Sequence, residues 1–198
     1  MTKWLIASNN KYKTIDLQKD LEYFGLDAEQ YTDFFEAVEF PDESTNSYKD
    51  NAVKKATFLS NKILRPVISD DSGIEIPALP NDLGVTTKRD LHKDQTKSDN
   101  QTLLELLKDM PDDKRQAKMI TYLAAVDLEG RVITAKGEVN GLIAHEDVGD
   151  YSSGFDKIFY LPELHKTLAQ IPDEKRIPLT HRGRAAQNLI KLIKHEAE

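Results

Sequence analysis

The sequence predicts an α/β fold with a mixed β-sheet flanked by helices. Short apolar runs typical of buried strands alternate with helical patterns in the first half of the chain, and two long β-branched segments around the turn dipeptide Glu129-Gly130 follow in the second. No repeat, low-complexity tract or linker interrupts the 198 residues, so we expect a single domain over 1–198.

The first half of the chain alternates strands and helices. Residues 3–8 form an apolar run suited to a buried strand, and a helical pattern follows up to a stop at Gly25. We expect a second strand over 34–40 and a short buried strand over 67–69. Residues 44–47 offer N-caps for the helix between them. The apolar face of that helix carries Tyr48, Ala52, Ala56, Leu59 and Ile63.

The second half adds a helix, a hairpin and a final helix. Residues 80–100 are polar and are expected to form a loop with weak helix, and the leucines of 103–107 predict a helix that stops before Pro111. Strands over 117–127 and 131–143 are expected to form a long hairpin. The apolar stripe that predicts the C-terminal helix contains Ala185, Ala186, Leu189, Ile190, Leu192 and Ile193.

Composition excludes several classes of function. The chain has no cysteine, which rules out disulfides, thiolate metal sites and a cysteine nucleophile. Its 27 Lys+Arg against 34 Asp+Glu give a net charge of −7, which argues against a nucleic-acid partner. The longest apolar runs fall far short of the ~20 residues that span a bilayer, and the start of the chain lacks a signal-peptide pattern. We expect a soluble, cytoplasmic protein that binds neither nucleic acid nor membranes.

The polar segment from Ser8 to Lys13 follows the first strand directly and opens the first helix. Free backbone N–H groups and the positive end of the helix dipole favour phosphate at such a position, and Lys13 adds a charge. Ordinary N-capping by Ser8 or Asn10 is the alternative interpretation.

A pair of adjacent carboxylates, Asp70 and Asp71, follows the strand over 67–69. Mg²⁺ prefers one or two carboxylates together with phosphate oxygens, and a carboxylate can also position or deprotonate a water. The alternative is an acidic turn in which Gly73 adopts a positive φ.

Two further polar segments have structural alternatives of their own. Asp50 and Lys54 are i, i+4 neighbours away from the apolar helix face, which is typical of a solvated ion pair. His181 precedes Arg182 at the start of the last helix, where the two side chains could bind an anion or a base carbonyl.

Taken in order along the chain, these segments resemble the inosine/xanthosine triphosphate pyrophosphatases, the house-cleaning family that acts on non-canonical purine nucleotides. The resemblance covers nearly the whole chain. Its first motifs are S-x-N-x-x-K at 8–13, D-N-A-x-x-K-A at 50–56 and D-D-S-G-I-E-I at 70–76. The later matches are Arg89, Gly137, 141–143, 154–159 and T-H-R-G-R-A at 180–185.

The resemblance implies an elongated mixed β-sheet flanked by helices, in two lobes with a nucleotide cleft between them, and usually a homodimer. It also implies Mg²⁺-dependent hydrolysis of non-canonical purine nucleoside triphosphates (ITP, dITP, XTP) to the monophosphate and pyrophosphate. Asp71 would be the catalytic base and, with Asp50 and Asp70, a metal ligand. The substrate-binding residues would be Ser8, Asn10, Lys13, Lys55, Ser72, Arg89, Ser153, Gly154, Phe155, Asp156, Arg176, His181 and Arg182.

The chain departs from the family pattern at three of these positions. Asp50 stands where glutamate is usual, Ser153 where an aromatic residue stacks on the base, and Arg176 where a lysine is usual. Two alternatives therefore stay open: a pyrophosphatase with shifted or relaxed base preference, and a nucleotide-binding homologue with impaired catalysis. A polar α/β scaffold without a small-molecule site is a third.

Overall fold

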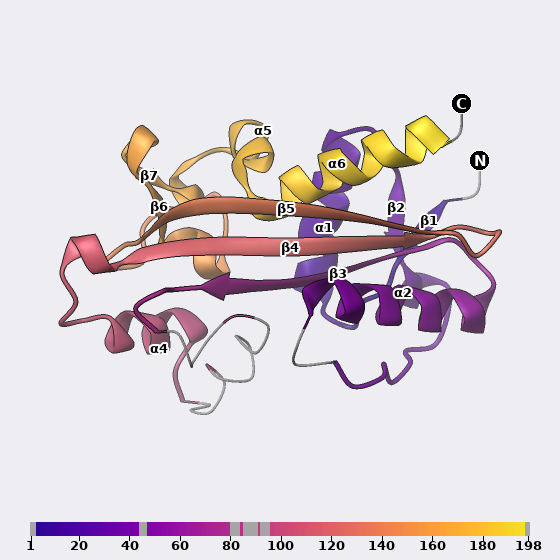
Figure 1. Cartoon of the computed structure of the whole chain (residues 1–198), viewed down its shortest axis with the longest axis horizontal. Helices are drawn as coiled ribbons and strands as arrows, with labels where there is room; N and C mark the ends of the chain where they lie inside the picture. Colours follow the sequence, from indigo (N-terminus) through magenta and orange to yellow (C-terminus); the bar gives the residue numbers. More distant parts are fainter. Residues whose placement is uncertain (1–2, 44–46, 80–83, 85–90, 92–95, 197–198) are drawn as a thin grey trace. The chain divides into compact units, whose positions relative to one another are not determined.

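The computed structural model describes residues 3–43, 47–79, 84, 91 and 96–196 (Figure 1). The strands are β1 (Trp4–Ile6), β2 (Ala28–Gln30), β3 (Val67–Glu75), β4 (Gln116–Val126), β5 (Val132–Ile143), β6 (Phe159–Leu161) and β7 (Lys166–Thr167). The α-helices are α1 (Lys11–Tyr23), α2 (Tyr48–Ile63), α4 (Asp99–Leu106), α5 (Asp173–Arg176) and α6 (His181–Glu196). Short 3-10 helices are η1 (Tyr31–Asp33), η2 (Asp112–Lys114), η3 (Gly154–Lys157), η4 (Pro162–Leu164), η5 (Leu168–Gln170) and η6 (Ile177–Leu179).

The strands form one mixed sheet, which confirms the predicted fold class. Their order is β2-β1-β3-β4-β5-β6-β7. β1 pairs in parallel with β2 and with β3, because α1 and α2 return the chain between successive strands. β6 pairs antiparallel with both β5 and β7. The predicted hairpin is β4–β5, and Gly130 takes a φ of +79° in the turn that joins them.

The chain divides into two compact units. Unit 1 comprises Met1–Ser72, Thr121–Gly137 and His181–Glu198, and unit 2 comprises Gly73–Ile120 and Glu138–Thr180. Strands β3, β4 and β5 contribute residues to both units. The division corresponds to the two predicted lobes, whereas the single domain and the nucleotide cleft stay predictions.

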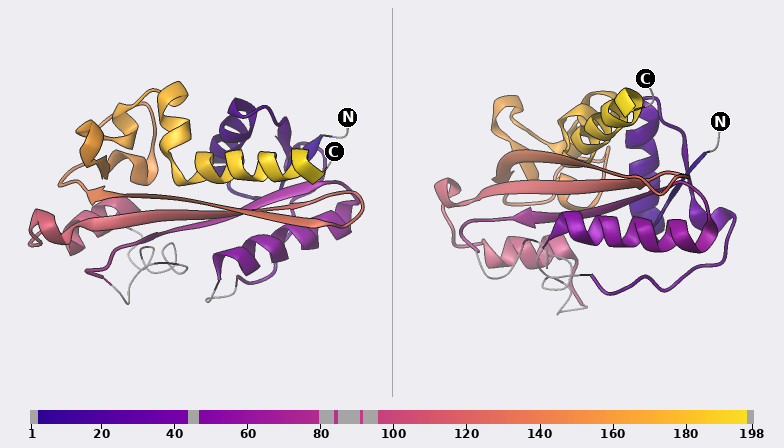
Figure 2. Two further views of the ribbon diagram at one scale, coloured as in Figure 1. Left: turned by 45° about the horizontal axis from the view of Figure 1, so that its top comes forward. Right: turned by 45° about the vertical axis from the view of Figure 1, so that its right-hand side comes forward.

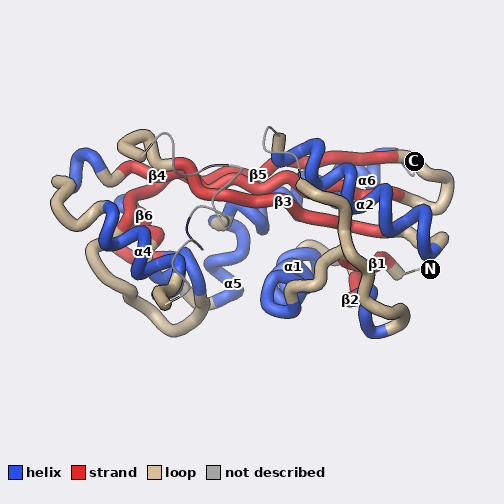
Figure 3. Tube along the Cα trace, turned by 90° about the horizontal axis from the view of Figure 1, so that it is seen from below, coloured by secondary structure: helices blue, strands red, loops and turns tan. Residues whose placement is uncertain are grey.

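Unit 1 has three layers, with helices on both faces of its strands (Figure 2). α1 and α6 pack on one face and α2 on the other (Figure 2), and α2 runs along β3 (Figure 3). Successive strand residues point to opposite faces. The core on the α1 and α6 side therefore includes Ile6, Leu17, Ile68, Ala185 and Leu189. The core on the α2 side includes Leu5, Ala52, Ala56, Val67 and Ala124.

Unit 2 has its own hydrophobic core, which gathers side chains of β3, α4, β4, β5 and β6. Arg115 is buried beside this core, and its guanidinium donates to the backbone oxygens of Leu107, Ile143 and Ala144 at 2.5–2.7 Å. Because each donation satisfies a buried carbonyl, the cation ties the end of α4 to the end of β5. Among the described residues, no helix is both long and apolar enough to cross a membrane.

The second strand lies earlier in the chain than predicted. Residues 34–40 contain no strand, and Ala28–Gln30 pairs with β1 instead. Phe35, Val38 and Phe40 still pack in the core beside α2. The backbone of Val38 accepts a hydrogen bond from the Asn9 side chain and donates one to the Tyr31 hydroxyl. The apolar pattern of 34–40 thus reflects burial of side chains in the core, although the backbone of this segment is irregular. The loop predicted over 80–100 lies mainly outside the described residues, and its last two residues belong to α4.

Candidate active site on unit 1

The acidic pair Asp70 and Asp71 lies inside β3, not in a turn after it. β3 continues to Glu75, and Gly73 is part of the strand, so both the predicted strand end and the acidic-turn alternative are wrong. Both carboxylates are buried, with 3% and 6% of their residue surface exposed. Because adjacent strand residues face opposite ways, Asp70 points to the α1 and α6 side and Asp71 to the α2 side.

Asp70 lies among cations from different helices. Its Oδ2 atom is 3.8 Å from Lys13 Nζ on α1, 3.9 Å from Arg182 Nε on α6, and 2.9 Å from the donating hydroxyl of Ser72. Burial opposes the charged form, but Lys13, Arg182 and Lys55 outweigh it and hold the pKa of Asp70 far below its usual range. Asp70 is therefore a permanently ionised carboxylate.

Asp71 has a different environment, formed by α2. Asn51 Nδ2 donates to Asp71 Oδ2 at 2.8 Å, and Lys55 Nζ lies 4.0 Å from the other oxygen, Oδ1. Burial raises the pKa of Asp71 to about 6, although Lys55 and the Asn51 hydrogen bond act in the opposite direction. A carboxyl group that titrates in this range can accept a proton from water at neutral pH.

Glu43, which the sequence analysis missed, also belongs to this cluster. Its Oε1 atom lies 2.9 Å from Lys55 Nζ. Burial would raise the pKa of Glu43, but Lys55 lowers it overall. Burial would also lower the pKa of Lys55, but Asp70, Glu43 and Asp71 raise it, so this lysine stays charged. Glu43 was not predicted because it precedes α2 in a segment without periodicity. Asn51 was not predicted because its motif was interpreted through the charged residues beside it.

The loop after β1 is held in place by its own side chains. Asn10 is the N-cap of α1: its side chain accepts from the backbone N–H groups of Tyr12 and Lys13 at 3.1 and 3.2 Å. Ser8 Oγ accepts from the backbone N–H of Asn10 at 3.1 Å. Asn9 accepts from the Tyr31 hydroxyl, a contact with no sequence signal. Capping by Asn10 is thus confirmed, while phosphate binding by Ser8, Asn10 and Lys13 stays a prediction.

The start of α6 brings His181 and Arg182 to the same side of unit 1 as Asp70. His181 is buried, and its pKa falls to about 3 because of burial and the neighbouring Arg182 charge, so the imidazole is neutral at physiological pH. Its Nδ1 atom has no partner among the described residues. Arg182 also lies 3.9 Å from Asp16. The predicted contacts of His181 and Arg182 with a base stay predictions.

The oxygens of Asp70 and Asp71 are of the type that Mg²⁺ prefers. The part of the chain that the structure describes holds no cluster of three or more His, Asp or Glu side chains suited to a metal ion. Asp50 is exposed in the first turn of α2, where its N–H donates to Ser47, and Lys54 donates to Asp42 O at 2.7 Å. Metal binding by Asp50 remains a prediction.

The other predicted binding residues belong to unit 2. Arg176 Nη1 and the Ser152 hydroxyl both donate to Asp156 Oδ2, at 2.6 and 2.7 Å, and Arg176 Nη2 donates to Asp173 at 2.5 Å. Burial would lower the pKa of Arg176, but Asp156 and Asp173 raise it. The remaining members, exposed or half-buried in the adjoining segment, are Ser153, Gly154 and Phe155. Arg89 lies outside the described residues.

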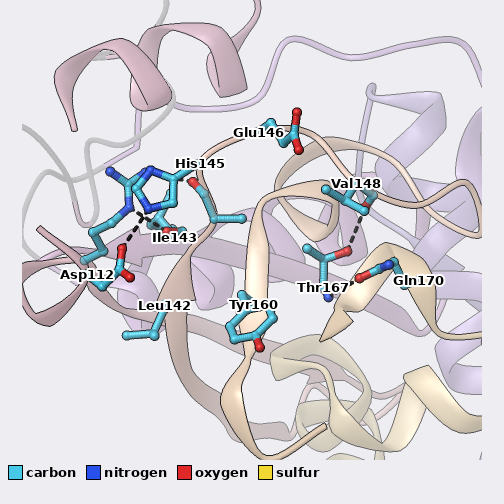
Figure 4. A pocket seen from close by; sticks show the side chains of 11 residues that line it. Asp112, Leu142, Ile143, His145, Glu146, Val148, Tyr160, Thr167 and Gln170 are labelled. Carbon is cyan, nitrogen blue, oxygen red and sulfur yellow. Dashed lines mark hydrogen bonds and ion pairs between the residues drawn. The ribbon is translucent and has the colours of Figure 1, made fainter. Parts of the chain in front are cut away.

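A cavity of about 410 Å³ also lies in unit 2, and its lining contains none of the predicted site residues (Figure 4). His145 Nε2 is 2.7 Å from Asp112, and the Thr167 hydroxyl donates to Val148 O at 2.6 Å. Gln170 accepts from the backbone N–H of Thr167 at 2.9 Å. The polar side chains at this wall are thus largely engaged within the protein.

The fold and the cluster define an α/β protein with a buried carboxylate pair beside lysine and arginine side chains. A model of the Ham1 family matches residues 4–192. The chain belongs to the Ham1 family. Its solved relatives include a HAM1 protein from Coxiella burnetii, with TM-score 0.80 and 27% identity over 98% of this chain and 100% of that one. The Ham1 protein of Staphylococcus aureus gives a TM-score of 0.79 and 27% identity, covering 98% and 99%.

Similar proteins are named for two different activities. The dITP/XTP pyrophosphatase of Desulforamulus reducens is 34% identical over 195 residues, which is 96% of this chain and 95% of the relative. The dITP/XTP pyrophosphatase of Escherichia coli is 32% identical over 199 residues, covering 98% and 100%. The dihydroneopterin triphosphate diphosphatase of Limosilactobacillus reuteri is 34% identical over 190 residues, covering 94% and 95%. The names agree on a triphosphate and differ in the ring system attached to it.

Proposed function

We propose that this chain is a nucleoside triphosphate pyrophosphatase that hydrolyses non-canonical purine nucleotides (ITP, dITP, XTP) to the monophosphate and pyrophosphate. The observation that carries the proposal is the cluster on unit 1, in which Lys13, Lys55 and Arg182 surround a buried pair of unlike carboxylates. The dITP/XTP pyrophosphatases among the relatives support the choice of substrate. This activity would remove non-canonical purine triphosphates from the cellular nucleotide pool.

The proposed mechanism relies on charge neutralisation and on one positioned base. Lys13 and Lys55 would bind phosphate oxygens, and Ser8 and Asn10 would line the phosphate path. Asp71 would accept a proton from water as the water oxygen attacks the α-phosphorus, and the bond to the bridging oxygen breaks with pyrophosphate as the leaving group. Asp70 would stay ionised throughout.

We propose Mg²⁺ as the cofactor, held on the α2 side of β3 by Asp71, with Asp50 of α2 as a further ligand. Asp70 was predicted as a third ligand, but it points to the other face of the strand, where Lys13 and Arg182 lie beside it, so the proposal does not include it. The bound ion would supply neutralisation of the negative charge on the phosphate oxygens. Three parts of the proposal rest on the resemblance or on composition, namely the Mg²⁺ requirement, a homodimer and a cytoplasmic location. Size-exclusion chromatography with light scattering tests the homodimer directly.

Base recognition is proposed for a second set of residues. Asp156 and Arg176 of unit 2, with Ser153, Gly154 and Phe155, would contact the base, as would His181, Arg182 and Arg89. Ser153 cannot stack as an aromatic side chain does, and each lost stacking contact can cost about 1–3 kcal/mol. This substitution favours a second candidate, a pyrophosphatase with shifted base preference. Dihydroneopterin triphosphate is one such substrate, because a relative is named for it.

A panel of triphosphates decides between these candidates. We expect the purified chain to release pyrophosphate from ITP, dITP or XTP at least about tenfold faster, as kcat/KM, than from ATP and GTP. The measurement is pyrophosphate release with Mg²⁺ and with EDTA. A preference for dihydroneopterin triphosphate would establish the second candidate. Nucleotide binding by calorimetry without release from any substrate would establish a homologue with impaired catalysis.

The Lys13→Ala variant tests the phosphate role. Because Lys13 is partly exposed and charged, its loss should weaken triphosphate binding, and we expect KM to rise about tenfold. Steady-state pyrophosphate release measures this. Lys11→Ala on the same helix is the matched control, since Lys11 is an exposed lysine outside the cluster. An unchanged KM in Lys13→Ala would remove this lysine from the phosphate site.

A further inference from the structure

The side of β3 that carries Asp71 is in fixed register with α2. Ser69, two residues before Asp71, points to the same face and donates to the backbone oxygen of Ala52 at 2.5 Å. Ala52 itself is fully buried against the strands. The residue before it, Asn51, is 1% exposed and donates to Asp71 Oδ2 at 2.8 Å. Helix and strand are thus joined at two neighbouring points, one of which is the acid itself.

The two oxygens of Asp71 consequently have different surroundings. Oδ2 accepts the amide hydrogen of Asn51, while Oδ1 lies 4.0 Å from Lys55 Nζ. The terminal torsion of an aspartate is soft, so packing alone does not select one orientation of the carboxylate plane. Without the amide donor, Asp71 is free to turn toward the lysine and form a closer ion pair. Such a pair would occupy the oxygen that is meant to accept a proton.

We propose that Asn51 is a positioning residue that fixes the orientation of the Asp71 carboxylate and keeps Oδ1 directed toward the reacting water. The inference rests on the proposed function, because it assigns Asn51 a role only through the base. Asn51 neither binds the triphosphate nor takes part in proton transfer. Its contribution should therefore appear in the chemical step and not in substrate binding.

The Asn51→Ala variant tests this role in the full chain with ITP or the preferred substrate of the panel. We expect kcat to fall about 10- to 100-fold, with KM changed less than about threefold. Asn188→Ala is the matched control: Asn188 also lies on a helix and donates one amide hydrogen bond, to Lys136 O at 2.9 Å, outside the cluster. The control should keep the kcat of the unaltered chain. A kcat in Asn51→Ala equal to that of the control would overturn the proposal.

A double-mutant cycle separates positioning from a general structural effect. If Asn51 acts through Asp71, adding Asn51→Ala to Asp71→Asn should lower the remaining activity less than about twofold. The same fold-loss in both backgrounds would overturn the proposal. The exchange variant Asn51→Asp with Asp71→Asn keeps one amide and one carboxylate at the contact. It should melt close to the unaltered chain and remain inactive, whereas recovery of activity would show that orientation at residue 71 is not required.

Failure of the inference is distinguishable from failure of the proposed function. An unaltered chain that releases no pyrophosphate from any triphosphate would overturn both. An active unaltered chain with an unaffected or strictly additive Asn51→Ala variant would overturn the inference alone.

Discussion

Replacing Asp71 with asparagine is expected to lower kcat by about 10³-fold, because the side chain loses its capacity to accept a proton. The change is nearly isosteric and leaves the buried contact with Asn51 in place, so we expect the chain to fold. Pyrophosphate release and circular dichroism measure the two properties. Near-normal turnover in this variant would remove Asp71 from the catalytic role.

The same variant should be more stable than the unaltered chain at neutral pH. Burial raises the pKa of Asp71 from 3.8 to about 6, so between these values the unfolded state gives up its proton before the folded state does. The free energy of unfolding therefore falls as the pH rises from the unfolded to the folded pKa of Asp71, and the full destabilisation by the buried charge is reached above the folded pKa. We expect Asp71→Asn to gain about 1–2 kcal/mol at pH 8 and little at pH 4.

Urea unfolding in EDTA at both pH values tests this prediction without a contribution from metal binding. Ser72→Ala is the comparison, because Ser72 donates to the neighbouring acid, whose pKa is low rather than high. That variant should not become more stable at pH 8. A stability gain of Asp71→Asn that is the same at both pH values would contradict the titration argument.

Gly137→Ala is expected to cause the largest loss of stability. A Cβ at this position of β5 would lie 2.0 Å from His181 O and 2.3 Å from Ala185 N, both of them backbone atoms of α6. Since neither atom can move without moving the helix, we expect a loss of about 3 kcal/mol or more. For a chain of this size, that corresponds to a Tm lowered by about 10 °C.

Thermal melts of Gly137→Ala and Gly130→Ala separate steric conflict from backbone strain. Gly130 has a φ of +79° and open space where its Cβ would be, so its alanine variant should cost only about 1 kcal/mol. Gly137→Ala should also lower activity, because the displaced helix carries His181 and Arg182. Equal destabilisation by the two variants would contradict the assigned close approach of strand and helix.

The elements predicted best are those whose periodicity is long. The hairpin and α2 were expected almost within their observed limits, because each presents a continuous apolar face, whereas α6 begins at His181, before the apolar stripe from Ala185 that predicted it. The second strand was misplaced because it has only three residues, of which Ala28 alone is apolar, whereas 34–40 buries apolar side chains without strand pairing. β6 and β7 are too short to leave a pattern. Such segments are determined by tertiary contacts that no local window contains.

The sequence predicted which residues form the candidate site, but not how their side chains are arranged in space. Lys13 does lie near Asp70, and Lys55 near Asp71, but not because loops that follow strands meet: the acids lie inside β3, and the lysines are carried by α1 and α2. What could not be predicted is that Arg182 lies beside Asp70, or that Glu43 contacts Lys55. These contacts depend on where α6 and the segment before α2 pack. The unlike chemistry of the two acids also follows from burial, which composition and spacing do not report.

The alternation of side chains along β3 constrains how this protein can change over evolutionary time. Asp70 and Asp71 differ only in the face of the strand on which each lies. Inserting or deleting a single residue upstream within β3 would turn each acid to the opposite face of the strand, so neither would keep its present surroundings. We therefore expect natural variants of this chain to tolerate length changes in the connection between α2 and β3, but none between Val67 and Asp71.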